Sequence, residues 1–223
     1  MQQQHEVAFE PVAGEVSIPI TEQDRPLRLR RRWFKLRNQS TFSTFLPARF
    51  PPSQPWTMLT IGVFEGAAEV WLMQNVLTHP DSRLYCIDPW EQTTKLDQAF
   101  MHECRQNAEY NLLPWAQRVT LTQGYSQDVM SASIARGNHC GVPIGTFDLV
   151  IIDGDHNLEP VYQDAVNALE FVKPNGWLLF DDVRNRIYKP DHVYHGIEKF
   201  LGTHRSAVEK VFAHRYMDCY RKR

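Results

Sequence analysis

From Met58 to the C-terminus, short apolar runs alternate with helical segments. The runs LVII and WLLF are apolar on both faces, as expected for strands covered by helices on both sides. Strands and helices in this order form a doubly wound, mostly parallel sheet. We therefore expect an α/β protein with a seven-stranded, Rossmann-like sheet. The predicted strands are 58–63, 83–88, 118–123, 147–153 and 176–181, with two more or a hairpin in 206–223; the predicted helices are 66–77, 97–112, 126–136, 160–172 and 192–203.

The composition is that of a soluble globular protein, with 43% hydrophobic and 22% charged residues among 223. A net charge of −2 predicts neither nucleic acid nor an anionic membrane as a partner of the whole chain. The four cysteines contain no C-x-x-C pair, which argues against a zinc knuckle or a disulfide framework. No signal peptide and no apolar run of about 18 residues is present, so we expect a cytoplasmic protein without a membrane span.

The N-terminal part differs from the rest of the chain. Residues 1–24 are polar, and 25–37 hold seven basic residues and no acidic one. We therefore divide the chain into a tail and basic arm or lid, 1–57, and a ligand-binding domain, 58–223. The segment 25–37 could contact nucleic-acid phosphates, with Trp33 and Phe34 stacking on bases. Alternatively, it packs on its own domain and closes over the active site. A homodimer is left open.

The first strand ends in a glycine-containing turn. Ligands of parallel sheets bind at the carboxyl ends of the strands, and Gly62 and Gly66 would let the backbone turn tightly there. A dinucleotide fingerprint would need further glycines where this chain has Phe64 and Ala67. The sequence therefore disfavours a nicotinamide dehydrogenase, while a simple strand-to-helix turn stays an alternative.

Polar residues follow the second and third strands. Asp88 could accept hydrogen bonds from both hydroxyls of a ribose, or cap the turn after it. Ser126 or Gln127 could bond to an adenine edge, or Ser126 could cap the next helix. Together with the glycine turn, these residues predict an adenosine-containing cofactor.

Carboxylates follow the fourth and fifth strands, in the sequences DGDH (153–156) and DDV (181–183). Neighbouring strands lie about 4.8 Å apart, so Asp153 and Asp181 can converge. Such close carboxylates repel, and a positive group should neutralise them. Oxygen ligands without cysteine suit Mg²⁺, Ca²⁺ or Mn²⁺ better than zinc. In the alternative reading, Asp182 caps the next segment and Asp155 bonds to backbone.

These motifs together resemble the class I S-adenosylmethionine-dependent methyltransferases. The most similar groups are small enzymes with a D-G-D-H signature and metal-dependent O-methyltransferases of the catechol type. The resemblance covers about 58–183. It rests on IGVFEG (61–66), CIDPW (86–90), GYSQD (124–128), DLVIIDGDH (148–156) and FDDV (180–183).

The resemblance implies transfer of a methyl group from S-adenosylmethionine to a hydroxyl oxygen of a small molecule. The alternative, which rests on the basic residues of 25–37, is an RNA- or nucleic-acid-binding protein or an RNA methyltransferase. His156 or Asp155 would act as the base. Asp153, Asp181 and Asp182 would bind Mg²⁺ or another divalent cation. The chain departs from the family at Thr60, where an acidic residue is usual. The implied cofactor contacts are Thr60, Gly62, Phe64, Gly66, Asp88, Ser126, Gln127 and Asp153.

Overall fold

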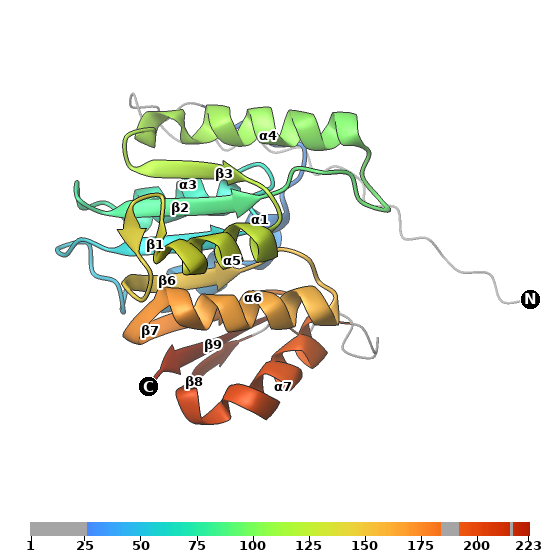
Figure 1. Cartoon of the computed structure of the whole chain (residues 1–223). Helices are drawn as coiled ribbons and strands as arrows, with labels where there is room; N and C mark the ends of the chain where they lie inside the picture. Colours follow the sequence, from blue (N-terminus) through green and yellow to red (C-terminus); the bar gives the residue numbers. More distant parts are fainter. Residues whose placement is uncertain (1–25, 184–191, 215) are drawn as a thin grey trace, which may run out of the picture.

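The computed structural model describes residues 26–183, 192–214 and 216–223. Its main sheet has seven strands in the order β3-β2-β1-β6-β7-β9-β8, which confirms the predicted fold (Figure 1). The predictions for residues 1–25, including Arg25, lie outside the described residues. The strands of the sheet are β1 (Thr57–Ile61), β2 (Arg83–Asp88), β3 (Val119–Gln123), β6 (Phe147–Ile152), β7 (Val172–Phe180), β8 (Val208–His214) and β9 (Met217–Lys222).

Parallel pairing brings the candidate residues to one edge of the sheet. The central strand β1 pairs in parallel with β2 and β6, and these pair in parallel with β3 and β7. The carboxyl ends of all five strands therefore lie at the same edge. The antiparallel hairpin β8–β9 joins the sheet next to β7, as expected for the C-terminal tail.

Helices cover both faces of the sheet (Figure 1). Side chains alternate along β1, so Met58 packs toward one helical layer and Leu59 toward the other. One layer contains α1 (Trp33–Arg37), α2 (Gln39–Phe45), α3 (Ala67–Asn75) and α4 (Gln98–Leu112); the other contains α5 (Ser126–Arg136), α6 (Leu158–Phe171) and α7 (Val193–His204). Short elements η1 (Leu113–Trp115), η2 (Arg205–Ala207), β4 (Asn138–His139) and β5 (Val142–Pro143) connect them.

The second half of the predicted N-terminal arm packs into the domain. Phe42, Phe45 and Phe50 are buried in the same core as α3 and α4. The ring of Phe42 lies 5.6 Å from Trp71, and that of Phe45 lies 5.9 Å from Trp177. This part of the arm is thus fixed to the sheet. Within the described ranges, no helix is both long and apolar enough to cross a membrane.

Candidate active site

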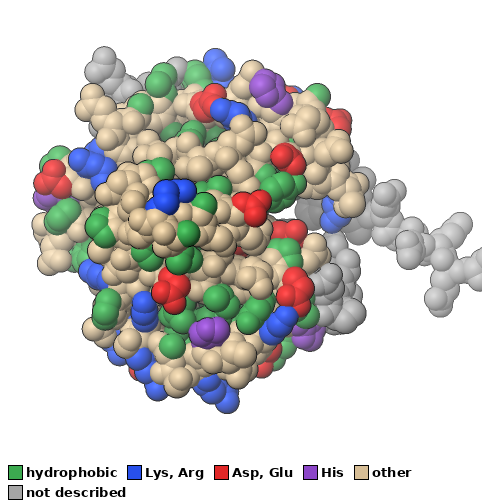
Figure 2. Space-filling view, in the orientation of Figure 1, with side chains coloured by type: hydrophobic (Ala, Val, Ile, Leu, Met, Phe, Trp, Pro, Cys, Tyr) green, Lys and Arg blue, Asp and Glu red, His purple; other side chains and the backbone are tan. Residues whose placement is uncertain are grey.

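Backbone strain marks the edge where the parallel strands end. Three of the five described non-glycine residues with positive φ follow β1, β2 and β7 there: Phe64 (φ 55°), Trp90 (φ 45°) and Asp182 (φ 54°). Such conformations cost free energy and cluster at functional sites. Figure 2 shows several acidic side chains around a hollow on the side where the strands of Figure 1 end. These observations select this edge as the candidate active site.

The turn after β1, residues 62–66, is named the cofactor turn here, after the role that the sequence resemblance implies for it. Gly62 has φ 85°, and a Cβ at this position would lie 2.0 Å from the carbonyl oxygen of Asp153. Backbone bonds from Gly62 to Ile87 and from Asp153 to Ile61 fix the turn on both neighbouring strands. Gly66, with φ 79°, is the N-cap of α3. Both glycines therefore occupy positions where a side chain is not readily accommodated.

Asp88 holds the cofactor turn in place. One carboxylate oxygen accepts the backbone N–H groups of Val63 and Phe64, at 2.8 and 2.9 Å, and the other accepts that of Trp90 at 2.7 Å. The Trp90 indole in turn donates to the Phe64 carbonyl at 2.8 Å. Burial raises the pKa of Asp88, and the three amide donors partly offset this effect. A carboxylate has about four acceptor positions, so one position is left for a ligand such as a ribose.

Replacing Asp88 with asparagine should weaken both the fold and cofactor binding. An amide nitrogen cannot accept, so at least one buried N–H would lose its partner, at a cost of about 1–3 kcal/mol. We expect lower stability in denaturant and weaker calorimetric binding of S-adenosylhomocysteine, the demethylated form of the cofactor that the resemblance implies. Asp97→Asn is the matched control, because Asp97 is an exposed N-cap of α4 and asparagine caps equally well. Equal effects of the two substitutions would contradict the role of Asp88.

Ser126 and Gln127 lie beside a buried acid that the sequence analysis missed. The Gln127 amide donates to Asp164 of α6 at 2.9 Å. Burial raises the pKa of Asp164 to about 7, and the Ser126 hydroxyl and Gln127 amide partly offset this effect. The N-cap of α5 is Tyr125, so the alternative that Ser126 caps this helix is wrong. The sequence contained one sign of this buried acid: Asp164 is an acidic residue on the apolar face of α6.

Thr60 faces a second missed acid, Glu69. Glu69 is 1% exposed in the first turn of α3, and Thr60 is 2% exposed on the β1 face below it. Burial, with smaller contributions from the charges of Asp153 and Asp88, raises the pKa of Glu69 to about 8, although its backbone N–H and Thr60 partly offset this rise. The family that the sequence resembles usually has an acidic residue at position 60. In this chain an acidic side chain, Glu69, lies beside that position on α3.

Glu69 should make stability depend on pH. Its carboxyl keeps a proton up to about pH 8 in the folded protein, whereas an ordinary glutamate loses it near 4.5. Between these two pH values only the unfolded chain releases the proton, so the free energy of unfolding falls by about 1.4 kcal/mol for each pH unit of increase. Glu69→Gln should flatten this part of the profile and be more stable than wild type near pH 8. Denaturant titrations across the range check this; parallel profiles of variant and wild type would contradict it.

The third group of predicted residues converges beyond β6 and β7. His156 contacts Asp153 at 3.6 Å through Nε2 and Asp182 at 3.4 Å through Nδ1. The Asp182 N–H donates to the Asp181 carboxylate at 2.7 Å. We call Asp153, Asp181 and Asp182 the acid cluster. Asp155 is exposed and accepts the Asn157 N–H at 2.9 Å, which matches the alternative of a backbone bond.

Charge repulsion changes the protonation of this group. Burial and the neighbouring carboxylates raise the pKa values of Asp153 and Asp181. Burial alone would lower the pKa of His156, but Asp153, Asp182 and Asp155 raise it above its ordinary value. When His156 is protonated, it is therefore a positive partner for the acid cluster.

The donor chemistry of the acid cluster suits a hard cation, but its geometry does not form a metal site. In the described part of the chain, no group of three or more His, Cys, Asp or Glu side chains is placed to hold a metal ion. His156 instead contacts two of the three predicted ligands. The structure thus brings Asp153, Asp181 and Asp182 to one edge without arranging them as metal ligands.

Comparison with known proteins identifies the fold and the family. Residues 59–183 match the model of a family described as a methyltransferase domain, and this match spans more than half of the chain. The chain belongs to this methyltransferase family. The recognition from sequence is confirmed, and the protein is an S-adenosylmethionine-dependent methyltransferase of class I. None of the curated proteins matches the sequence.

Solved structures share the fold at low identity. The O-methyltransferase TomG from Streptomyces achromogenes, in complex with SAM, is 20% identical over 90% of this chain and 82% of that chain, with a TM-score of 0.55. Cofactor-bound Rv0187 from MTB is 18% identical over 83% and 81%, with a TM-score of 0.59. MycE from the mycinamycin biosynthetic pathway, in complex with Mg, SAH and mycinamycin VI, is 17% identical over 90% and 52%, with a TM-score of 0.51.

Proposed function

We propose that this methyltransferase transfers the methyl group of S-adenosylmethionine to a hydroxyl oxygen of a small molecule. The observation that carries the proposal is His156, whose side chain is 46% exposed while its two nitrogens face Asp153 and Asp182. In its neutral form this imidazole can donate to one carboxylate and accept a proton at its other nitrogen, and its exposure leaves room for an acceptor molecule. It lies beyond β6, next to the cofactor turn that Asp153 contacts through its backbone.

The reaction is a displacement at the methyl carbon. The acceptor oxygen forms a bond to the methyl group, the bond from that group to the sulfonium breaks, and S-adenosylhomocysteine leaves with the electron pair. The hydroxyl proton passes to His156, whose pKa the neighbouring carboxylates raise. His156 must be neutral to accept this proton. Asp155 is the alternative base, although one of its oxygens already accepts the Asn157 N–H.

The proposed cofactor contacts lie around the cofactor turn. Asp88 would bind the ribose, Ser126 or Gln127 the adenine, and Gly62, Phe64 and Gly66 the amino-acid end. Thr60 and Asp153 complete this set. The buried acids near the turn, Glu69 among them, would be stabilised by a sulfonium charge. Positioning of donor and acceptor then supplies most of the rate.

A divalent cation stays part of the proposal. Support comes from the oxygen-rich acid cluster and from MycE, which is described in complex with Mg. Bound there, Mg²⁺ would polarise the acceptor oxygen and lower its pKa. No step above depends on it, because the cluster does not have the geometry of a metal site. Turnover with and without Mg²⁺, after treatment with a chelator, decides the question.

The function is tested in two stages. Calorimetric titration with S-adenosylhomocysteine should show binding, and its absence both with and without Mg²⁺ would overturn the proposal. Labelled S-adenosylmethionine is then offered with catechols, sugars, polyketides and short RNAs. We expect label on the oxygen of a hydroxylated small molecule. Label on RNA alone would favour the alternative function.

The nucleic-acid alternative has less structural support. In the basic segment, Arg30 pairs with Glu103 at 2.8 Å, and Arg28 lies 3.7 Å from the centre of the Tyr110 ring. Trp33 stacks on Phe64. These groups are thus used within the chain. RNA binding that weakens steeply with added salt would restore the alternative. A second copy as partner stays a proposal that a measurement of mass in solution can test.

A further inference from the structure

One stretch of the N-terminal arm, residues 26–38, lies along the candidate active site. We call it the docking segment. It has no regular secondary structure at first and then forms α1. It contacts the cofactor turn near Arg30 and the acid cluster at Asn38. The same short stretch therefore touches both halves of the proposed site.

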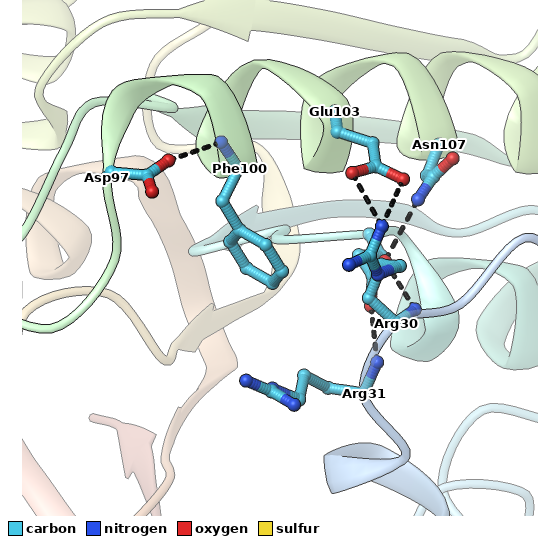
Figure 3. Close-up of polar contacts among 7 residues, drawn as sticks. Arg30, Arg31, Asp97, Phe100, Glu103 and Asn107 are labelled. Carbon is cyan, nitrogen blue, oxygen red and sulfur yellow. Dashed lines mark hydrogen bonds and ion pairs between the residues drawn. The ribbon is translucent and has the colours of Figure 1, made fainter.

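A buried glutamate in the cofactor turn binds the backbone of the docking segment. Glu65 is 1% exposed, and its two carboxylate oxygens accept the N–H groups of Arg30 and Arg31, at 2.7 and 3.0 Å. Asn107 of α4 donates to the same carboxylate at 3.0 Å. Figure 3 shows Asn107 on the same side of α4 as Glu103, with Arg30 below them. Hydrogen bonds to a buried charged group are among the stronger ones, so Glu65 is a main anchor of the segment.

A second polar side chain extends the attachment. Asn111 accepts the Arg28 N–H at 2.8 Å and donates to the Arg28 carbonyl at 3.0 Å. The same amide group donates to the Glu65 carbonyl at 2.8 Å. Asn111 is 3% exposed. The buried polar contacts of the docking segment at Arg28, Arg30 and Arg31 are thus made by its backbone, in addition to the contacts of the Arg28 and Arg30 side chains.

Aromatic stacking joins the segment to the strained residue of the cofactor turn. The Trp33 ring lies 4.9 Å from the Phe64 ring with an interplanar angle of 17°. Phe64 is the turn residue with φ 55°. Trp33 is the first residue of α1, so this contact attaches the start of the helix to the cofactor turn.

At its other end, the docking segment contacts the acid cluster. The Asn38 amide, 8% exposed, donates to one carboxylate oxygen of Asp181. The other oxygen of Asp181 accepts the Asp182 N–H, and Asp182 contacts His156. Asn38 therefore restrains the carboxylate on which the orientation of Asp182 depends.

We propose that Glu65 is a positioning residue that docks residues 26–38 onto the active site, and that the docked segment orients Asp181 through Asn38. This inference rests on the proposed function. It assigns the arm a task in methyl transfer: the cofactor turn and the acid cluster are aligned with each other through the segment that contacts both. Glu65 acts on the reaction only through this segment.

A matched control separates the backbone anchor from the surface ion pair. Glu103 also contacts Arg30, but through the guanidinium, and both side chains are about half exposed, at 42% and 54%. An exposed pair of this kind contributes little. Glu65→Gln and Glu103→Gln therefore make the same chemical change to two carboxylates that contact the same residue, one buried and one exposed.

The experiment measures docking and catalysis separately. Trypsin cleaves after the basic residues of the segment, and we expect Glu65→Gln to be cut there about tenfold faster than wild type, while Glu103→Gln is unchanged. With an accepted substrate, Glu65→Gln and Asn38→Ala should each lower kcat about tenfold, and Asn38→Ala should leave the KM for S-adenosylmethionine unchanged. Because Glu65 acts through Asn38, the double variant should lose no more kcat than the more damaged single variant.

Three outcomes would overturn the inference: equal cleavage of Glu65→Gln and Glu103→Gln, full kcat in Asn38→Ala, or additive losses in the double variant. If Glu65→Gln does not fold, Arg31→Pro removes one donor to Glu65 from an exposed position. Its readout is kcat rather than trypsin cleavage, because proline at 31 also removes tryptic sites. Hydrogen exchange of the Asp182 amide, which Asn38→Ala should accelerate, needs no turnover. If the wild-type protein transfers no methyl group, the proposed function is refuted. Trypsin cleavage and hydrogen exchange still test whether Glu65 docks residues 26–38.

Discussion

Gly62→Ala is expected to abolish S-adenosylhomocysteine binding and to destabilise the protein by several kcal/mol. Two effects add at this position. The backbone φ of 85° is strained for alanine, and the new methyl group would lie 2.0 Å from the Asp153 carbonyl oxygen. The contact is with backbone, so relief requires that the end of β6 move away from β1. That movement would displace Asp153 and the cofactor turn together.

Gly137→Ala provides the matched control. Gly137 has a similar φ of 74°, but no atom lies within 4 Å of the position of its Cβ. It should therefore show the conformational cost alone, about 1 kcal/mol. Denaturant unfolding and calorimetry measure both variants. If the two substitutions destabilise the protein equally, the close approach of Gly62 to Asp153 is not what matters.

The elements that sequence patterns predicted well are those with strong local signals. The predicted strand 83–88 and helix 126–136 have the observed limits, and the other four predicted helices differ by one or two residues. In contrast, β7 begins at Val172, four residues before the predicted strand 176–181, and includes Pro174, Asn175 and Gly176, which are uncommon in strands. Asn175, near the start of β7, has φ 63°. The pairing of β7 with β6 shifts register between Phe147 and Leu149, and this shift accommodates the irregular start of the strand. Tertiary pairing overrode the local preference.

The helices of the arm could not be predicted for a different reason. With five and seven residues, α1 and α2 are too short to show helical periodicity. They are stabilised by contacts with distant rings, among them Trp71 and Trp177. Only the three-dimensional arrangement of the sheet brings these partners together.

The residues of the candidate site also fall into a group that the sequence predicted and a group that it did not. Residues at strand ends were predictable, because the carboxyl edge of a parallel sheet is a general ligand site. Glu65, Asn38 and Glu69 were missed. Glu65 looked like an ordinary turn residue, and Asn38 contacts Asp181 across a separation of 143 residues. The importance of such residues comes from burial and distant partners, neither of which a single sequence displays.

His156→Ala is expected to lower kcat by about 100-fold or more while S-adenosylhomocysteine still binds. His156 is the exposed group beside the acid cluster, and its removal leaves the cofactor turn intact. His102→Ala is the matched control, since His102 is exposed on α4 and its ring makes a polar contact with the side chain of Gln106. A fully active His156→Ala would assign the proton to Asp155 or to water.

The pH profile tests whether His156 works with the acid cluster. Neutral imidazole is the active form, so kcat/KM should rise with pH through the raised pKa of His156. Asp182→Asn removes one of the carboxylates that raise this pKa, so the rise should move to lower pH even as the maximum falls. Loss of a metal ligand would lower the maximum and make activity depend on added Mg²⁺ instead. A rise that stays at the same pH would show that Asp182 does not act through His156.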